Sequence, residues 1–546
     1  MSMKNKLAIF TIIVLVLISL FYMEIDEFFS GDEVVTYSMA NNSDGGFVFS
    51  QGRISDYLSS VIFADGGDGL ISKLYLLGID VVRNKSKAQI LNYPRDPEVK
   101  LYSGDDVCDW FQKRDYERFN LWTTWLHSLS DDGNSWLYYC LVNISSSLFM
   151  GISLTKWSGF IVNIVFYILT LLMLYRMGKR LGNSNVQNVG MLFFYGLSFD
   201  TISVTVTNMR PYTLAAFEAT LMVYLILEIY RCAVIEKKAF NGKIPLLILA
   251  YGIGYVSHYT VGAAFVSFGL TLLLFMLIGN CERVGIIVMT GALGLIFGIL
   301  LSPDSVVGII KKFFSNGAGS DTKAGTVATI ILLLAIAVFV FLIMSIIKDK
   351  HTIENELVYT TCAVSLMFII IVGGTKGFGY ARVLFPVTYL VIHRWIVIAG
   401  INLAEKYRER LIRSVGLVLL TVYAIVNLGI GYEYKMAENK TFLAKQAALD
   451  KVSADICYYF RKHAQGYMDI RNLLGRFDRI QVITLDTEGW EDMVEMLPSS
   501  VEQPVVFYFA DDSEDESAEQ WMESYGYSNI GDVYNDESTH IFVASN

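Results

Sequence analysis

Long apolar runs separated by short polar connectors fill the chain up to about residue 434. The first run, residues 7–23, follows a basic start but precedes no small-residue cleavage site, so it predicts a retained membrane helix and not a removed signal peptide. The later runs predict membrane spans at residues 157–175, 187–207, 211–230, 244–280, 284–302, 325–347, 357–373, 383–400 and 414–434. Because the run at 244–280 is too long for one crossing, we expect it to break near His258.

Basic connectors set the orientation of the spans. Lys4 and Lys6 place the N-terminus in the cytoplasm, and the basic connector at 176–180 is expected on the same side. An even number of crossings must therefore separate the N-terminus from this connector. Two apolar runs, 136–152 and 157–175, lie between the first span and the connector, so one of them does not cross the membrane. Residues 136–152 carry Asn143 and three adjacent serines, so this run predicts a helix lying in the membrane interface.

The expected architecture is a polytopic α-helical membrane protein with about eleven crossings, an inside N-terminus and an external loop at residues 24–156. From about residue 435 the pattern changes. A helical pattern at 440–463 precedes strand-like runs (IQVITL, VVFYFA, HIFVAS) that alternate with helical ones, which predicts a small external α/β domain. The predicted division is thus a membrane module at 1–434 and a C-terminal domain at 435–546.

Composition agrees with a membrane protein, because 53% of the residues are hydrophobic and only 18% are charged. The net charge is −10, and no Lys or Arg follows Arg479, which argues against nucleic acid as a partner because phosphate binding needs a basic surface. The six cysteines show no metal-ligand spacing. Cys108 and Cys457 are the candidates for a disulfide outside the membrane.

Charged and aromatic residues gather at the predicted external ends of the spans. Asp32 and Glu33 follow the first span directly, and Asp200 and Glu218 are carboxylates inside predicted spans, where a charge is costly and needs a partner or a cavity. Further candidates at external ends are Arg210 and Tyr212, His258 and Tyr259, and Lys376 and Arg382. External cations beside carboxylates suit a lipid-phosphate substrate, because Lys and Arg hold a phosphate while a carboxylate withdraws a proton from an attacking hydroxyl.

In order and membrane placement, several segments up to about residue 400 resemble the GT-C superfamily of polytopic glycosyltransferases, and within it the glycosyltransferase family 39 relatives, which include protein O-mannosyltransferases and aminoarabinose transferase-like proteins. The segments are SGDEVVTYSM, DDGNSWLYYCLVNISSSLF, TKWSGFIVNIVFYILTLLMLYRMGKRLG, LSFDTISVTVTNMRPYTLAAF, GYVSHYTVGAAF and GYARVLFPVTYLVI. One departure concerns the second segment, where Gly133, Asn134 and Ser135 replace the family's His-Pro-Pro.

The resemblance implies a GT-C-like fold and transfer of a hexose or pentose, with inversion, from a polyprenyl-phosphate donor at the external face of the membrane. It implies Asp32 as the general base, Glu33 as a residue that orients the acceptor or its helix, and Arg210, Lys376 and Arg382 as phosphate ligands. The candidates for the substrate pocket are Asp131, Asp132, Tyr138, Tyr139, Tyr212, His258, Tyr259 and Tyr380.

Several alternatives stay open at this point. Arg210 also suits a side chain that snorkels to the interface, and Asp131 and Asp132 suit a turn or, with Asp32, a site for Mg or Mn. No cofactor is certain. The acceptor is a lipid, a cell-wall glycan or a protein, and we expect the plasma (inner) membrane of a prokaryotic cell envelope. The competing functions are a transporter or flippase of a lipid-linked substrate and a noncatalytic receptor or assembly protein.

Overall fold

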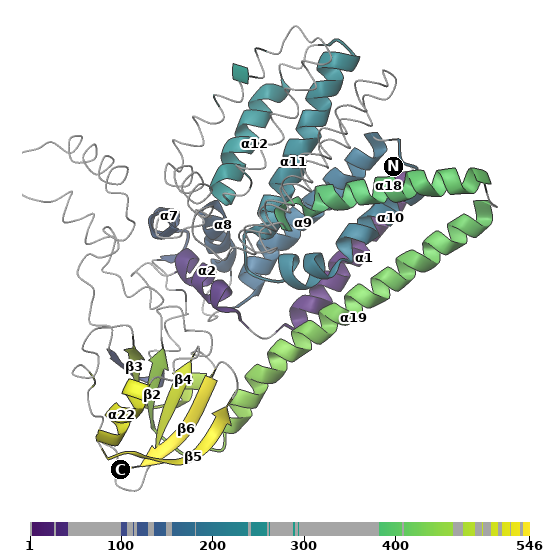
Figure 1. Cartoon of the computed structure of the whole chain (residues 1–546). Helices are drawn as coiled ribbons and strands as arrows, with labels where there is room; N and C mark the ends of the chain where they lie inside the picture. Colours follow the sequence, from purple (N-terminus) through teal and green to yellow (C-terminus); the bar gives the residue numbers. More distant parts are fainter. Residues whose placement is uncertain are drawn as a thin grey trace, which may run out of the picture. The chain divides into compact units, whose positions relative to one another are not determined.

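Figure 1 shows the protein as a computed structural model of the whole chain. The structure describes residues 3–26, 29–41, 100–105, 113, 117–128, 136–148, 155–180, 182–238, 242–258, 261, 285, 288–289, 293, 382–406, 409–461, 473–485, 494, 504–510, 516–524, 526–535 and 539–545. By its internal contacts the chain divides into two compact units, which are described separately. The first comprises residues 1–25, 131–138 and 160–434, and the second comprises residues 26–130, 139–159 and 435–546. The predicted division at residue 434 stays a prediction.

Apolar helices make up the first unit. Within the described residues, four helices are long and apolar enough to cross a membrane: α1 (Met3–Glu24), α9 (Trp157–Arg180), α11 (Tyr212–Tyr230) and α19 (Glu409–Leu449). The pair formed by α10 (Asn185–Gly196) and the π-helix η2 (Asp200–Val206) is apolar enough for a further span, bent by 55°. The remaining helices are η3 (Arg231–Ile235), α12 (Lys243–Ser257) and α18 (Phe385–Lys406).

These helices confirm the prediction of a helical membrane protein. The predicted break near His258 is also confirmed, because α12 ends at Ser257 and His258 is extended, with φ −166° and ψ 132°. The predicted spans at 284–302, 325–347 and 357–373 lie outside the described residues apart from single positions. The total of about eleven crossings therefore stays a prediction.

Close helix contacts in the first unit depend on small residues. A Cβ atom on Gly196 would lie 2.6 Å from Leu15 Cδ1 and 2.8 Å from the Tyr167 hydroxyl, so α1 and α9 approach the α10 backbone as only glycine permits. The Tyr167 hydroxyl donates a hydrogen bond to the Gly196 carbonyl, at 3.1 Å. The Tyr22 hydroxyl of α1 donates to the Leu428 carbonyl of α19. Small residues and backbone acceptors are common at helix contacts in membranes, where apolar surface alone gives little attraction between helices.

The irregular backbone between α10 and α11, which includes the bend between α10 and η2, is stabilised by side chains that pair with backbone groups. In η2 the carbonyls lose their ordinary α-helical partners. The Thr213 hydroxyl donates to the Thr205 carbonyl at 2.6 Å, and the Thr207 hydroxyl donates to the Ser203 carbonyl at 3.0 Å. Asn427 of α19 accepts from the Phe199 backbone N–H at 2.9 Å. Side chains of the same unit therefore take part in holding the irregular backbone that precedes Arg210.

In the second unit, the external loop of the prediction contributes three short helices, of which α8 begins in the first unit. They are α2 (Gly31–Asn41), α7 (Leu121–Ser128) and α8 (Trp136–Ser146). Helix α8 covers the first part of the interfacial helix predicted at 136–152. Its 11 residues make it only about 16 Å long, which is too short for a membrane span.

A six-stranded mixed sheet forms the rest of the second unit (Figure 1). Its strands are β1 (Lys100–Tyr102), β2 (Ile456–Arg461), β3 (Arg479–Thr484), β4 (Val505–Ala510), β5 (Ser528–Asn535) and β6 (Thr539–Ser545), in the order β1-β3-β2-β4-β6-β5. β3, β2 and β4 are parallel, while β1, β6 and β5 are antiparallel to their neighbours. The short helices η5 (Leu474–Arg476) and α22 (Glu516–Ser524) complete the unit.

Part of the prediction for this region was wrong. The predicted helix at 440–463 ends at Leu449, and residues 456–461 form β2, because the aromatic run ICYYFR is buried between two parallel strands. The sequence also showed no sign of β1, which comes from residues 44–115 of the predicted external loop, called the insertion below, and joins the sheet of the C-terminal residues. Cys457 lies in β2 as a buried free thiol, so the disulfide with Cys108 is not formed.

Docking of β1 depends on Gly104. A Cβ atom there would lie 2.4 Å from the Gly475 carbonyl oxygen and 2.5 Å from the Phe477 carbonyl oxygen, and backbone atoms cannot move aside as a flexible side chain can. The Gly104 N–H also donates to the Phe477 carbonyl, at 2.9 Å. The contact holds the end of the insertion against the turn at η5.

We expect Gly104→Ala to lower the free energy of unfolding of this unit by about 1–3 kcal/mol, because the added methyl overpacks a backbone contact. Limited proteolysis of the purified protein, read as cleavage within residues 42–99, measures the release of β1. Gly531→Ala is the matched control, since a Cβ atom at Gly531 meets nothing within 4 Å. Equal protection of Gly104→Ala and Gly531→Ala would contradict the assignment.

Candidate functional site

Helix α2 carries the acidic pair of the sequence in its first turn. Ser30 precedes the helix, and Glu33 reaches back so that its Oε2 accepts from the Ser30 N–H at 3.0 Å and from the Ser30 hydroxyl at 3.1 Å. This is one half of a capping box, in which the third helical residue satisfies the N–H of the residue before the helix. Asp32 is the second residue of α2, and its side chain lies outside the described part of the structure.

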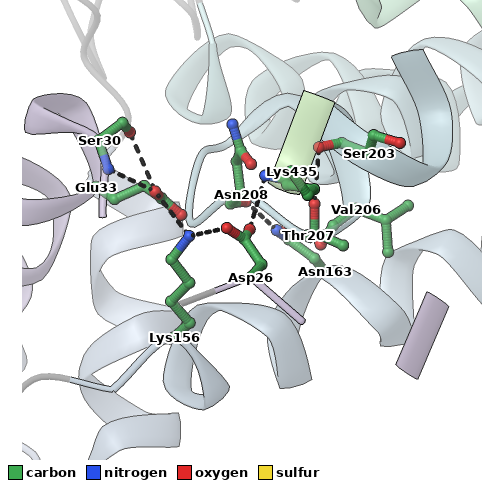
Figure 2. Close-up of polar contacts among 10 residues, drawn as sticks. All are labelled: Asp26, Ser30, Glu33, Lys156, Asn163, Ser203, Val206, Thr207, Asn208 and Lys435. Carbon is green, nitrogen blue, oxygen red and sulfur yellow. Dashed lines mark hydrogen bonds and ion pairs between the residues drawn. The ribbon is translucent and has the colours of Figure 1, made fainter. Parts of the chain in front are cut away.

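A buried group of four charges surrounds the start of α2 (Figure 2). Lys156 Nζ lies 2.9 Å from Asp26 Oδ1 and 3.3 Å from Glu33 Oε2, and Lys435 Nζ lies 2.7 Å from Asp26 Oδ2. None of the four side chains is more than 3% exposed. Two carboxylates and two ammonium groups sum to zero, which is how charges are tolerated away from water. We call these residues the ion quartet.

Electrostatics in the ion quartet favour the charged form of its central lysine. Burial by itself lowers the pKa of Lys156, but the charges of Glu33 and Asp26 and their hydrogen bonds outweigh it, so the pKa of Lys156 is raised. Lys156 also lies 5.2 Å from the centroid of the Phe29 ring, a cation–π distance. The lysine therefore stays an ammonium group that joins the residues just before α2 to its third residue.

The other end of α2 is anchored by a second buried lysine. Lys113 Nζ donates to Asn41 Oδ1 at 3.1 Å, to the Asn143 carbonyl at 2.8 Å and to the Ser146 hydroxyl at 3.0 Å. The Ala40 carbonyl accepts from Asn143 Nδ2 at 2.7 Å and from the Thr124 hydroxyl at 2.9 Å. Both ends of α2 are thus fixed by buried polar contacts, and the helix that holds Asp32 is rigidly placed within its unit.

A second group of predicted residues meets at Tyr212 in the first unit. The guanidinium carbons of Arg210 and Arg382 each lie 5.7 Å from the centroid of the Tyr212 ring, and the His258 ring lies 5.5 Å from it. Arg382 Nε lies 3.4 Å from Asp200 Oδ1, with the Arg382 side chain 22% exposed. Burial and then the charge of Arg210 lower the pKa of His258 to about 3, so this imidazole is neutral at pH 7. We call these five residues the arginine cluster.

Arg210 is held by the polar network of Asn163. Asn163 Nδ2 donates to the Val206 carbonyl at 3.1 Å and to the Asn208 carbonyl at 2.6 Å (Figure 2). The Arg210 N–H donates to the same Asn208 carbonyl at 2.8 Å, and the Tyr138 hydroxyl donates to Asn163 Oδ1 at 3.1 Å. Tyr138, a predicted pocket residue, therefore supports the turn that presents Arg210.

The structure describes only some of the predicted site residues. Arg210, Tyr212, His258 and Arg382 come together in the first unit, Glu33 lies in the second, and Tyr139 is buried. Outside the described residues are the side chain of Asp32 and the whole of Asp131, Asp132, Tyr259, Lys376 and Tyr380. Within the described part, no group of three or more His, Cys, Asp or Glu residues suits a metal ion, and the proposed site for Mg or Mn falls on residues beyond it.

The sequence prediction missed Asp26, Lys156 and Lys435. Both lysines stand on the predicted external side next to a span, which is the same anomaly that singled out Lys376 and Arg382. The same criterion, a cation on the external side next to a span, would therefore have identified Lys156 and Lys435. Asp26 is the carboxylate directly after the first helix and gave no pattern of its own.

Comparisons with known proteins give limited similarity. No protein-family model matches the chain, and no curated protein matches it in sequence. Two crystal structures of ArnT from Cupriavidus metallidurans, one bound to undecaprenyl phosphate and one in the apo state, resemble it with TM-scores of 0.42 and 0.40 and identities of 13% and 12%. The similarity covers 74% of this chain in both cases and 87% and 86% of the ArnT chains. Such similarity carries no residue role over, so function has to be argued from the chain's own residues.

Substitution of Lys156 by Met leaves Glu33 and Asp26 with an uncompensated buried charge. We expect this change to lower the free energy of unfolding by about 3–5 kcal/mol, measured by chemical denaturation in detergent. Lys243→Met is the matched control: its ion pair with Glu228, at 2.9 Å, leaves the Lys243 side chain 32% exposed, and we expect about 1 kcal/mol or less. Adding Glu33→Gln to Lys156→Met should restore part of the loss, and strict additivity of the two changes would contradict the pairing.

Lys113 makes stability depend on pH in a defined window. Burial lowers its pKa from 10.5 to about 8, with smaller and opposed effects of Glu117 and Arg118. Between pH 8 and 10.5 the unfolded chain then binds more protons at this residue than the folded chain, so stability rises with pH there. The difference in melting temperature between wild type and Lys113→Met should shift in favour of the wild type across this window. A difference that stays constant or moves the other way is incompatible with a buried Lys113.

Proposed function

We propose that this protein is a membrane glycosyltransferase of the GT-C kind that uses a polyprenyl-phosphate-linked sugar as donor. The observation that supports it best is the arginine cluster, in which Arg210 and Arg382, 172 positions apart in the sequence, meet at one tyrosine ring. Asp200 supplies one carboxylate to Arg382, at 3.4 Å. A guanidinium group binds a phosphate through two parallel hydrogen bonds, so two arginines at one ring suit a phosphate ligand.

On this proposal the two arginines bind the donor phosphate and stabilise the charge that develops on it as it leaves. His258 is neutral at pH 7 and so adds no third positive charge. The Arg382 side chain is 22% exposed, which leaves it accessible to a ligand.

Asp32 is the proposed general base. It accepts the proton of the acceptor hydroxyl while the hydroxyl oxygen forms a bond to the anomeric carbon and the bond from that carbon to the phosphate oxygen breaks. The electron pair of the broken bond leaves with the phosphate. A single displacement of this kind inverts the anomeric centre.

Glu33 acts on this proposal as a positioning residue. Its carboxylate is engaged with Ser30 and Lys156, so it orients α2 and through the helix the neighbouring Asp32. Catalytic groups need such support, because a displacement of about 1 Å at the reacting atoms lowers a rate by roughly 100-fold. Of the two roles expected for Glu33, its contacts therefore favour orientation of the helix over direct contact with the acceptor.

The finer features remain part of the proposal. They are a hexose or pentose donor, an acceptor that is a lipid, a cell-wall glycan or a protein, placement in the plasma membrane of a prokaryotic cell envelope, and an external active site and C-terminal domain. A divalent ion at Asp32, Asp131 and Asp132 is the alternative to a metal-free reaction.

The test is transfer of labelled sugar from a panel of polyprenyl-phosphate donors in membranes that contain each variant. Asp32→Asn should lower transfer by about 100-fold or more while donor binding persists, because it removes the base and keeps the size. Arg382→Gln should mainly weaken donor binding. Glu24→Gln, an exposed acid at the end of α1, is the matched control and should transfer at the wild-type rate.

Two results would replace the proposal. If labelled donor crosses the membrane intact in the wild type and no transfer or hydrolysis occurs, the protein is a transporter. If Asp32→Asn and Arg382→Gln both match Glu24→Gln on every donor, neither residue belongs to a catalytic site.

A further inference from the structure

Another group of buried polar side chains lies away from the arginine cluster, where α9 ends, α10 begins and α18 packs on α10. Its members are Asn183, Asn188, His393 and Arg394, all in the first unit. A Cβ atom on Gly178 would lie 2.0 Å from Asn188 Oδ1 and 3.2 Å from Asn183 Nδ2, so both amides lie against the same glycine near the end of α9. Arg394 Nη1 donates to Asn183 Oδ1 at 2.8 Å, and His393 Nε2 lies 3.5 Å from the Cβ position of Gly190.

Most polar atoms of this group have no hydrogen-bond partner within the part of the chain that the structure describes. They are Asn183 Nδ2, both Nδ2 and Oδ1 of Asn188, His393 Nδ1 and Arg394 Nε. Asn188 is fully buried, at 0% exposure, and Asn183 and His393 are 8% and 9% exposed. An unpaired buried polar group costs about 1–3 kcal/mol, so five such atoms in one place need a common explanation.

The inventory of these atoms indicates an anion. Three of the five are N–H donors with free hydrogens, and only Asn188 Oδ1 is an obligate acceptor. Arg394 makes no ion pair with a carboxylate in the described part of the chain, and its contact to Asn183 uses Nη1, which leaves the Nε side of the guanidinium open. That side presents the two-donor fork that binds a phosphate.

The position in the chain indicates a lipid as the source of the phosphate. The group follows the basic connector at 176–180, which the charge pattern places in the cytoplasm. Arg394 donates to Asn183, which lies three residues after this connector, so its guanidinium lies at the level of the connector. Polar pockets between membrane helices on this side are suited to anionic headgroups.

We propose that Asn183, Asn188 and Arg394 form a binding site for the phosphate of an anionic phospholipid of the inner leaflet. Arg394 supplies the charge and the fork, and the two amides supply further donors. The site is independent of the proposed glycosyl transfer, because none of its residues belongs to the arginine cluster or to the ion quartet.

The test measures binding of phosphatidylglycerol to the full chain in an uncharged detergent, by native mass spectrometry and by the shift of the melting temperature. Arg394→Gln should weaken binding about tenfold or more, since a charge-assisted hydrogen bond contributes about 1.5–3 kcal/mol. Arg394→Lys keeps the charge but loses the fork and should bind with intermediate affinity. Arg176→Gln, an exposed arginine of the same connector, is the matched control and should bind like the wild type.

Asn188→Leu keeps the proposal testable if changes at Arg394 prevent folding. This substitution removes two unpaired polar atoms and keeps a similar side-chain volume. Without lipid, the variant should therefore melt at or above the wild-type temperature, and phosphatidylglycerol should raise its melting temperature less than that of the wild type. Equal binding by wild type, Arg394→Gln and Asn188→Leu would overturn the proposal, as would equal stabilisation by phosphatidylcholine. A full effect of inorganic phosphate alone at millimolar concentration would show a free-anion site and overturn the lipid assignment.

Discussion

The pairing of Lys156 with Asp26 and Glu33 is the interaction on which the second unit depends. It is buried, so its strength comes from the absence of competing water, and for the same reason loss of one partner is costly. Lys435 completes the balance by pairing with Asp26. The three segments that carry these residues are far apart in sequence, and an apolar contact would hold them together without fixing their register. Buried charges have one acceptable arrangement, which fixes the first residues of α2.

The other end of α2 is also held by a buried lysine, Lys113, but the partners of this lysine are neutral groups and not carboxylates. Lys113 is surrounded by carbonyl, amide and hydroxyl oxygens, which satisfy its three N–H donors but do not compensate its charge. Its pKa falls while that of Lys156 rises, although both lysines are buried. The contrast shows that partners and not burial alone decide the state of a lysine here. It also makes the Lys156 end of α2 the one that stays charged over a wide pH range.

Sequence patterns predicted those features that depend on neighbouring residues. Apolar runs located α1, α9 and α11, and the break after α12 followed from a run too long for one crossing. Arg382 was selected because cations at external span ends are unusual, and Arg210 because it lies at the junction of two predicted spans. The ion quartet, the strand β1 and the strand β2 were not found, since each is defined by a partner far away in the chain. β2 was taken for helix because its aromatic run has no strict alternation, and only its place between β3 and β4 makes it a strand.

Charge balance distinguishes the ion quartet from the group around Asn188. The ion quartet pairs two carboxylates with two ammonium groups, which is what a structural anchor requires. Arg394 and the amides beside it have no carboxylate partner within the described residues, although the same chain elsewhere pairs backbone groups near η2 with threonine and asparagine side chains. The open donors beside Arg394 in apolar surroundings are the reason for the proposal that an anionic ligand completes that site.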